Sequence, residues 1–146
     1  PHQIKLVNWS RDPDLALFEI TDPNFQFSGT IPKFNIVISA GEIIYSLGHP
    51  FGLSYAISKG KIFAPLCVIS EIKTPLLCHL PASDINNLHV GHGSSGGPIL
   101  NQAGEIIGMH IGAISNLMIG GKPAIFGLGV PSKEILKNIL VWINKN

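Results

Sequence analysis

The segment Gly93-Ser94-Ser95-Gly96-Gly97-Pro98, followed by Ile99-Leu100, decides how this chain is interpreted. Gly93 permits a turn in which backbone N–H groups of residues 93–95, above all those of Gly93 and Ser95, point into one small volume. Gly96 and Gly97 leave the Ser95 hydroxyl open to an approaching carbonyl group. Because converging donors stabilise a developing oxyanion, Ser95 is the candidate nucleophile, and Gly93, Ser94 and Ser95 form the candidate oxyanion hole. A plain Gly/Ser loop between two strands is the alternative.

The same residues also satisfy the pattern G-x-S-x-G, which is the nucleophile elbow of α/β-hydrolases. That elbow requires a helix directly after the serine, whereas Pro98-Ile99-Leu100 is typical of a strand. It also requires an acid and then a histidine later in the chain. His110 is the only histidine after Ser95, and the acid before it, Glu105, lies on the same short predicted strand. The elbow is therefore excluded.

Two further segments, one before and one after Ser95 in the chain, also indicate the fold. Upstream, Asp12-Pro13-Asp14 leads into the apolar run Leu15–Ile20; downstream lie 104–112 and 126–132. In this order and spacing the chain resembles the chymotrypsin-fold serine endopeptidases, in the branch that holds the HtrA-like proteases, glutamyl endopeptidases and viral processing proteases. The resemblance runs from about residue 4 to the end. It implies two β-barrels and a C-terminal helix, with Asp14 as the triad acid.

Composition agrees with an all-β fold, since 16 Gly and 11 Pro in 146 residues suit short strands and tight turns. A net charge of +1 with scattered lysines provides no cluster of basic residues that would bind nucleic acid. No apolar run approaches 18 residues, so no membrane span is expected.

No Cys/His/Asp set has metal-ligand spacing, and no cofactor is implied. For Cys67 and Cys78, a disulfide and two buried thiols both remain open. Nothing in the sequence indicates the cellular compartment.

The predicted organisation has three parts. Residues 1–34 are a remnant of the first barrel, 35–131 form a complete second barrel with Ser95, and 132–146 form the helix. Ser132 is the expected N-cap of that helix. The apolar stripe of the helix is Ile135, Leu136, Ile139, Leu140 and Ile143. Strands are expected at about 4–9, 14–20, 42–48, 54–66, 76–80, 98–101, 104–112 and 124–130.

The first barrel is incomplete in this sequence. The resemblance implies a catalytic histidine a few tens of residues ahead of the aspartate, yet only 13 residues precede Asp14 and His2 is their only histidine. We therefore expect a trypsin-like serine endopeptidase seen in its C-terminal portion. The general base would come from an upstream segment or a separate chain. The alternative is a catalytically inactive, protease-like module that binds an extended peptide.

The implied substrate is a polypeptide. The resemblance places five residues against it: His89, Val90, His110, Ile111 and Gly112. An imidazole donor at residue 110 favours cleavage after Glu or Gln, whereas Val90 favours a small aliphatic residue. A core role for His110, bonded to a neighbouring strand, is the alternative. His92 is expected to be exposed, and His49 and His79 receive no role.

Overall fold

The computed structural model describes residues 2–52, 56–81, 92–119 and 121–144. Within them the chain forms eight strands, one short 3₁₀ turn and one helix. The elements are β1 (Ile4–Arg11), β2 (Asp14–Ile20), β3 (Ile43–Gly48), η1 (Pro50–Gly52), β4 (Ala56–Ile69), β5 (Ile72–Pro81), β6 (Pro98–Asn101), β7 (Ile106–Ile119), β8 (Lys122–Pro131) and α1 (Ser132–Ile143).

Strands β3 to β8 close into one antiparallel barrel in the order β3-β4-β5-β8-β7-β6. Side chains that alternate along these strands fill its interior. Five of them are almost wholly inaccessible to solvent: Ile44, Ile62, Leu77, Ile99 and Ile107. The structure thus confirms a complete second barrel that carries Ser95.

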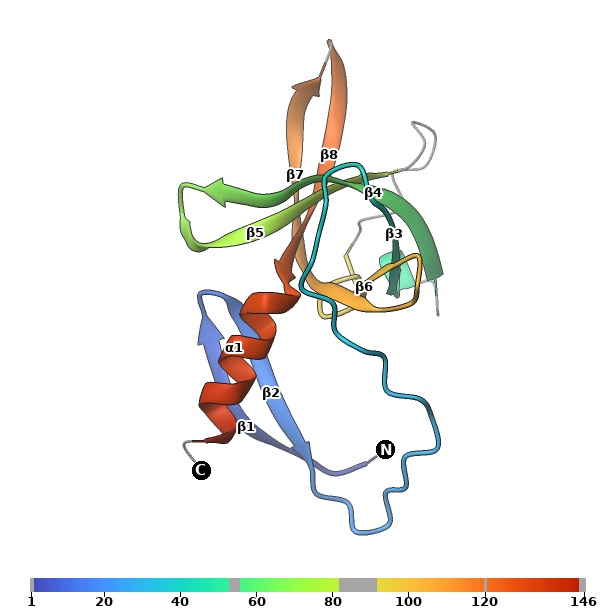
Figure 1. Cartoon of the computed structure of the whole chain (residues 1–146), viewed down its shortest axis with the longest axis vertical. Helices are drawn as coiled ribbons and strands as arrows, with labels where there is room; N and C mark the ends of the chain where they lie inside the picture. Colours follow the sequence, from blue (N-terminus) through green and yellow to red (C-terminus); the bar gives the residue numbers. More distant parts are fainter. Residues whose placement is uncertain (1, 53–55, 82–91, 120, 145–146) are drawn as a thin grey trace.

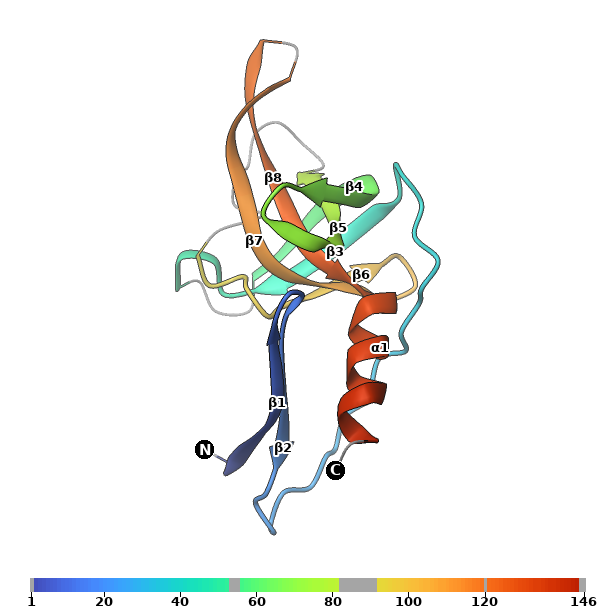
Figure 2. The ribbon, with the colours of Figure 1, turned by 90° about the vertical axis from the view of Figure 1, so that its left-hand side faces the viewer.

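Strands β1 and β2 form a separate two-stranded hairpin beside α1, below the barrel in Figure 1 and Figure 2. Leu15 is buried and Leu17 packs beside it in a second core between the hairpin, the helix and the outer face of the barrel. The buried members of that core are Leu15, Leu76, Cys78, Phe126, Leu128, Val130, Ile135 and Trp142. That this hairpin is a remnant of a first barrel stays a prediction; within the described residues it is a two-stranded sheet.

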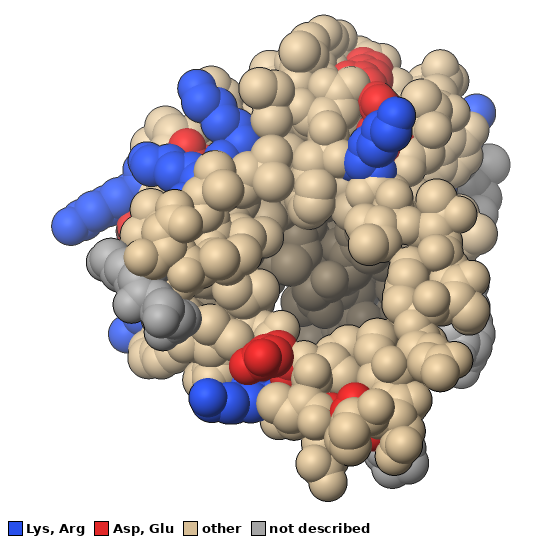
Figure 3. All heavy atoms as spheres, turned by 60° about the horizontal axis from the view of Figure 1, so that its bottom comes forward, with Lys and Arg blue, Asp and Glu red and all other residues tan. Residues whose placement is uncertain are grey.

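The face around the hairpin is rich in exposed apolar side chains. Trp9 is 63% exposed and Phe18 is 51% exposed. Seen from this end, the molecule is hollowed at its centre, and uncharged atoms line the hollow while charged side chains stand at the rim (Figure 3). A two-stranded ribbon of this kind is marginal alone and needs further strands or a packing partner.

Helix α1 corrects two details of the sequence analysis. Pro131, not Ser132, occupies the N-cap, because the Ser132 hydroxyl is buried and donates instead to the backbone carbonyl of Ile106 at 2.7 Å. The buried stripe includes Ile135 and Trp142. Leu140 and Ile143, which were expected in the stripe, are 61% and 59% exposed.

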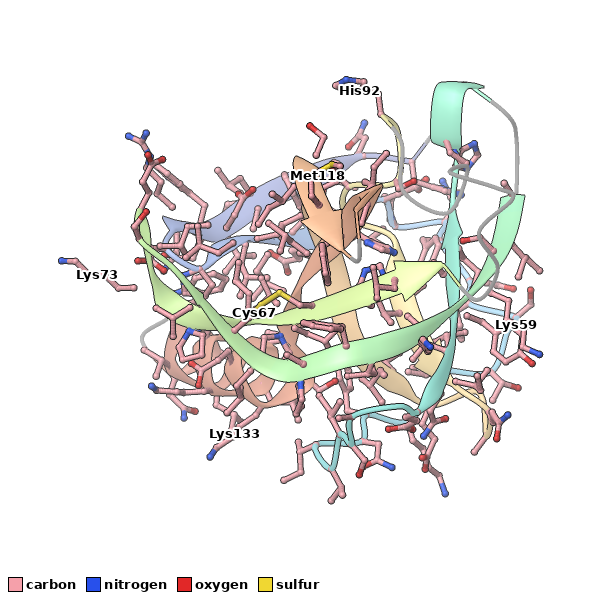
Figure 4. The ribbon with its side chains drawn as sticks, turned by 90° about the horizontal axis from the view of Figure 1, so that it is seen from above. Lys59, Cys67, Lys73, His92, Met118 and Lys133 are labelled. Atoms are coloured by element: carbon pink, nitrogen blue, oxygen red, sulfur yellow. A yellow bond between two sulfur atoms is a disulfide. The ribbon has the colours of Figure 1, made fainter. Side chains whose placement is uncertain are left out.

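The β4–β5 hairpin settles the question of the cysteines. Cys67 and Cys78 form a disulfide between these strands, with Cα atoms 6.1 Å apart (Figure 4). Strands β7 and β8 also exceed the predicted ranges, and their hairpin projects beyond the barrel (Figure 1). No helix in the described part of the chain is long and apolar enough to cross a membrane.

Candidate active site

Ser95 lies at the corner of a tight turn that precedes β6. The N–H of Gly97 donates to the Ser94 carbonyl at 3.0 Å, and Gly96 has a φ of +82°. A positive φ at the third residue of a four-residue turn is the mark of a type II turn, which glycine adopts without strain. Ser95 is therefore exposed, whereas Ser94 is buried at 7% exposure. Of the two adjacent serines, only Ser95 presents its side chain to solvent.

This turn is held from both sides. Toward β7, the N–H of Gly96 donates to the His110 carbonyl at 2.8 Å, and the N–H of His110 donates to the Gly97 carbonyl at 2.9 Å. Toward β3, the N–H of His49 donates to the Gly93 carbonyl at 3.2 Å. A Cβ atom at Gly97 would overlap the Leu47 carbonyl oxygen, and one at Gly93 would overlap that of His49. Both positions thus require glycine because backbone lies against them.

The N–H groups of Gly93 and Ser95 remain available beside the Ser95 hydroxyl. Within the described residues, no hydrogen bond engages either group. Both residues line a hollow of about 420 Å³ next to the turn, together with Leu47, Gly48, His49, Ile57, Gly96, Gly97 and Pro98. Two unengaged donors beside a hydroxyl are the parts that an oxyanion site requires.

Asp14 begins β2 directly after the hairpin turn and is exposed. It borders a second hollow of about 870 Å³, which Ile111 and Gly112 of β7 also border. The structure thus brings together Asp14 and two of the residues predicted to bind substrate. They lie on the strand that is bonded to the Ser95 turn through His110.

Asp12 fixes the hairpin turn to the barrel. Its carboxylate accepts the backbone N–H groups of Lys73 at 2.8 Å and Thr74 at 3.1 Å, at the start of β5. A side-chain hydrogen bond from Thr74, followed by the Lys73 backbone bond, lowers the pKa of Asp12 below 3.8. As the residue before Pro13, Asp12 is a turn residue by its sequence, but its bonds to β5 join positions about 60 residues apart and are not visible in the local pattern.

His110 is buried inside the barrel rather than open to solvent. It is 1% exposed, and its Nδ1 lies 3.3 Å from Nε2 of His79, which is fully buried. Both histidines lie opposite glycines of β8 in the backbone register, since His79 pairs with Gly127 and His110 with Gly129. The alternative was a core histidine bonded to a neighbouring strand; the burial of His110 agrees with a place in the core, but His79 lies on β5, which β8 separates from β7 in the barrel. Contact between His110 and a substrate stays a prediction.

The other described histidines are His2, His49 and His92. His2 contacts Asp22 at 2.7 Å, at the end of the hairpin opposite Asp14. His92 is exposed, as expected, and points away from the molecule in Figure 4. His89 and Val90 lie outside the described residues. His49, which received no role from the sequence, borders the hollow beside Ser95.

A model of the trypsin-like peptidase domain matches residues 1–109. The chain belongs to this family. Curated relatives include the chloroplastic Protease Do-like 1 of Arabidopsis thaliana, 27% identical over 73% of this chain, and Serine protease HTR4 of Bos taurus, 30% identical over 66% of it. These matches cover 24% and 19% of the relatives, so the chain spans at most a quarter of their length.

Solved structures agree on the fold. The HtrA-type protease AlgW, in a structure with a decapeptide, aligns over 98% of this chain and 41% of its own, with a TM-score of 0.73 and 20% identity. Rv3671c from M. tuberculosis aligns over 96% of this chain and 64% of its own, with a TM-score of 0.66 and 15% identity. The HtrA-like, chymotrypsin-type fold expected from the sequence is thus confirmed.

Proposed function

We propose that this chain carries the nucleophile half of a serine endopeptidase that hydrolyses polypeptides through an acyl-enzyme. The observation that carries the proposal is the exposed Ser95, on a turn fixed from both sides, together with the N–H groups of Gly93 and Ser95, which no hydrogen bond among the described residues engages. Ser95 Oγ would attack the peptide carbonyl carbon while these donors bind the oxyanion. Membership of the trypsin-like peptidase family supports this chemistry.

The general base is an imidazole that an upstream segment or a second chain supplies. It would take the Ser95 proton during attack and pass it to the leaving amine, after which water hydrolyses the ester. Asp14 would orient the ring and stabilise its charged form. The hollow of about 870 Å³ that Asp14 borders is large enough for such a side chain.

The acyl half of the substrate would lie along β7. Pairing between β6 and β7 ends at Met109, and the Ser95 turn takes the backbone groups of His110. From Gly112 onward, the described pairing of β7 is with β8 alone. An extended peptide can therefore add as a strand at Ile111 and Gly112, with its next carbonyl near Ser95.

A fluorophosphonate probe, which reports an activated serine, tests this proposal. The chain alone should not label because an unassisted hydroxyl is a weak nucleophile. The chain joined to its upstream segment should label, and Ser95→Ala should abolish the signal. Strong labelling of the isolated chain would contradict the proposal that the general base comes from outside this chain. Because His49 borders the same hollow as Ser95, His49→Ala is the variant that would then identify an internal base.

The β7 edge also favours a second candidate, a module that binds an extended peptide without cleaving it. Strand addition at Ile111 and Gly112 needs no base. Peptide binding by a completed protein that never labels at Ser95 would establish this alternative.

A further inference from the structure

The tip of the β4–β5 hairpin extends beyond the pairing of these strands with the rest of the barrel. Among the described pairs, β4 pairs with β3 only as far as Lys61, and β5 pairs with β8 only from Leu77 onward. Between these limits β4 and β5 pair with each other, and their register shifts on both sides of Cys67. The disulfide from Cys67 to Cys78 joins the strands at this irregular stretch. It therefore closes residues 68–77 into a loop.

Asp12 attaches the β1–β2 turn to this tip. Each of its carboxylate oxygens accepts one backbone N–H, from Lys73 at 2.8 Å and from Thr74 at 3.1 Å. A carboxylate accepts at both oxygens, whereas the NH₂ group of an asparagine would face one of the two donors. The pair of bonds is thus specific to an ionised Asp or Glu side chain.

Asp14 follows two residues later and is exposed at the start of β2. Leu15, directly after it, is buried in the same cluster as Cys78 of the disulfide. The backbone on both sides of Asp14 is therefore attached to β5, by the hydrogen bonds of Asp12 and by the packing of Leu15. Tip residues 71–73 also border the hollow of about 870 Å³ that Asp14 borders.

We propose that Asp12 is a positioning residue, which couples the disulfide-closed tip of the β4–β5 hairpin to the candidate triad acid Asp14. The inference rests on the endopeptidase function proposed above, in which Asp14 orients the imidazole. While the disulfide closes the tip, Asp12 holds the Asp14 carboxylate in place. Once the disulfide is broken, Asp12 loses its fixed partner, Asp14 shifts, and acylation of Ser95 slows. A shift of about 1 Å can lower a rate by about 100-fold.

The role of Asp12 is tested in the completed enzyme, meaning this chain joined to its upstream segment, with rates corrected for the folded fraction. Asp12→Asn should slow the acylation of Ser95 by a saturating peptide ester about 10-fold, with a change in KM below about 2-fold. A displaced Asp14 also stabilises the imidazolium less. The pH at which the acylation rate reaches half its plateau should therefore fall by about 0.5 or more. Loss of folded protein alone would leave that midpoint in place.

Asp22→Asn is the matched control. The Asp22 carboxylate also accepts a backbone N–H, from Asn24 at 2.9 Å, but it lies at the end of the hairpin opposite Asp14. Its acylation rate and pH midpoint should equal those of the unmodified enzyme.

Reduction tests the coupling to the disulfide. A small dithiol such as dithiothreitol breaks the bond between Cys67 and Cys78, leaves two thiols and is itself oxidised to a cyclic disulfide. Reduction should slow acylation about 10-fold in the unmodified enzyme but about 2-fold or less in Asp12→Asn, because both changes act through one contact. The double variant Cys67→Ala, Cys78→Ala should be slow without the dithiol and should not respond to it.

The outcomes separate this inference from the function on which it rests. A full acylation rate or an unshifted midpoint in Asp12→Asn, or an equal loss in Asp22→Asn, would overturn the positioning role. Effects of reduction and of Asp12→Asn that simply multiply would overturn the coupling. In each of these cases the acylation of Ser95 leaves the endopeptidase standing, whereas a completed protein that never acylates would overturn both.

Discussion

At the scale of single residues, glycines position the candidate nucleophile Ser95. Gly97 lies so close to the Leu47 carbonyl that no side chain fits between the turn and β3. Gly112, in contrast, has open space around its α-carbon and an ordinary φ. We therefore expect Gly97→Ala to lower the free energy of unfolding by about 2 kcal/mol or more and to abolish labelling of Ser95. Gly112→Ala should stay within about 0.5 kcal/mol. Denaturant unfolding measures both, and equal stabilities would contradict the described packing.

His110 makes a second prediction at this scale. If its imidazole donates to the substrate, the completed enzyme should cleave after Glu or Gln, because a basic side chain would meet no carboxylate and an apolar one would leave the donor unsatisfied. His110→Ala should remove that preference in a peptide-library profile. A preference for Val or Ala that survives His110→Ala would confine His110 to the core beside His79.

Local patterns predicted part of the site and missed the rest for a physical reason. The Ser95 turn and the Asp14 strand are continuous segments, so their glycines, polar residues and alternating apolar residues were readable in the sequence. The contact of His79 with His110 depends on β5 and β7 pairing with the same strand, β8, at its glycines. The bonds of Asp12 to β5 likewise join residues about 60 positions apart. Such contacts follow from topology, which a single sequence did not reveal.

Elements joined by charged hydrogen bonds should separate at low pH. Asp12 ties the β1–β2 turn to β5. Glu105 accepts from the side chains of Asn101 and Asn35, and these bonds lower its pKa below 4.5. A carboxylate whose pKa is lower in the folded state stabilises the fold above its unfolded value, and this contribution is lost as pH falls through the folded value. Stability should therefore decline below about pH 4.5.

Variants with neutral side chains test whether these two carboxylates cause the loss of stability at low pH. Asp12→Asn and Glu105→Gln should each lower stability at pH 7 and flatten its dependence on pH between about 3 and 5, measured by denaturant unfolding. An unchanged slope in both variants would assign acid sensitivity to other groups.

The predicted bounds and caps of single elements were wrong where contacts with other elements outweighed the local sequence pattern. Ser132 is a good N-cap by type, but the Ile106 carbonyl takes its hydroxyl. Strand β7 continues past the predicted end at residue 112, up to Ile119, and its pairing with β8 shifts register between His110 and Gly112 and again between Ile114 and Leu117. Each shift breaks the two-residue alternation that marks a strand in the sequence.

At the scale of the whole molecule, the described residues form a closed barrel and a two-stranded hairpin, and no third strand among them pairs with the hairpin. Amide hydrogen exchange should therefore be slow in β6 and in residues 106–112 of β7, and fast in β1 and along the outer edge of β2. The same experiment on the completed protein should slow exchange in β1 and β2, since added strands would pair their open edges. Uniformly slow exchange across residues 4–20 of the isolated chain would show that these strands already have partners.

Acylation of one serine tests the central claim most directly. The completed protein is mixed with a slowly deacylating peptide ester, quenched in acid, and mapped by mass spectrometry. We predict one acyl group per chain on Ser95 and none on the buried Ser94, with a strongly reduced acylation rate in Asp14→Asn, which would leave the imidazole poorly oriented. Turnover of the ester that leaves Ser95 unmodified, or an Asp14→Asn variant that acylates at the full rate, would contradict the proposed endopeptidase.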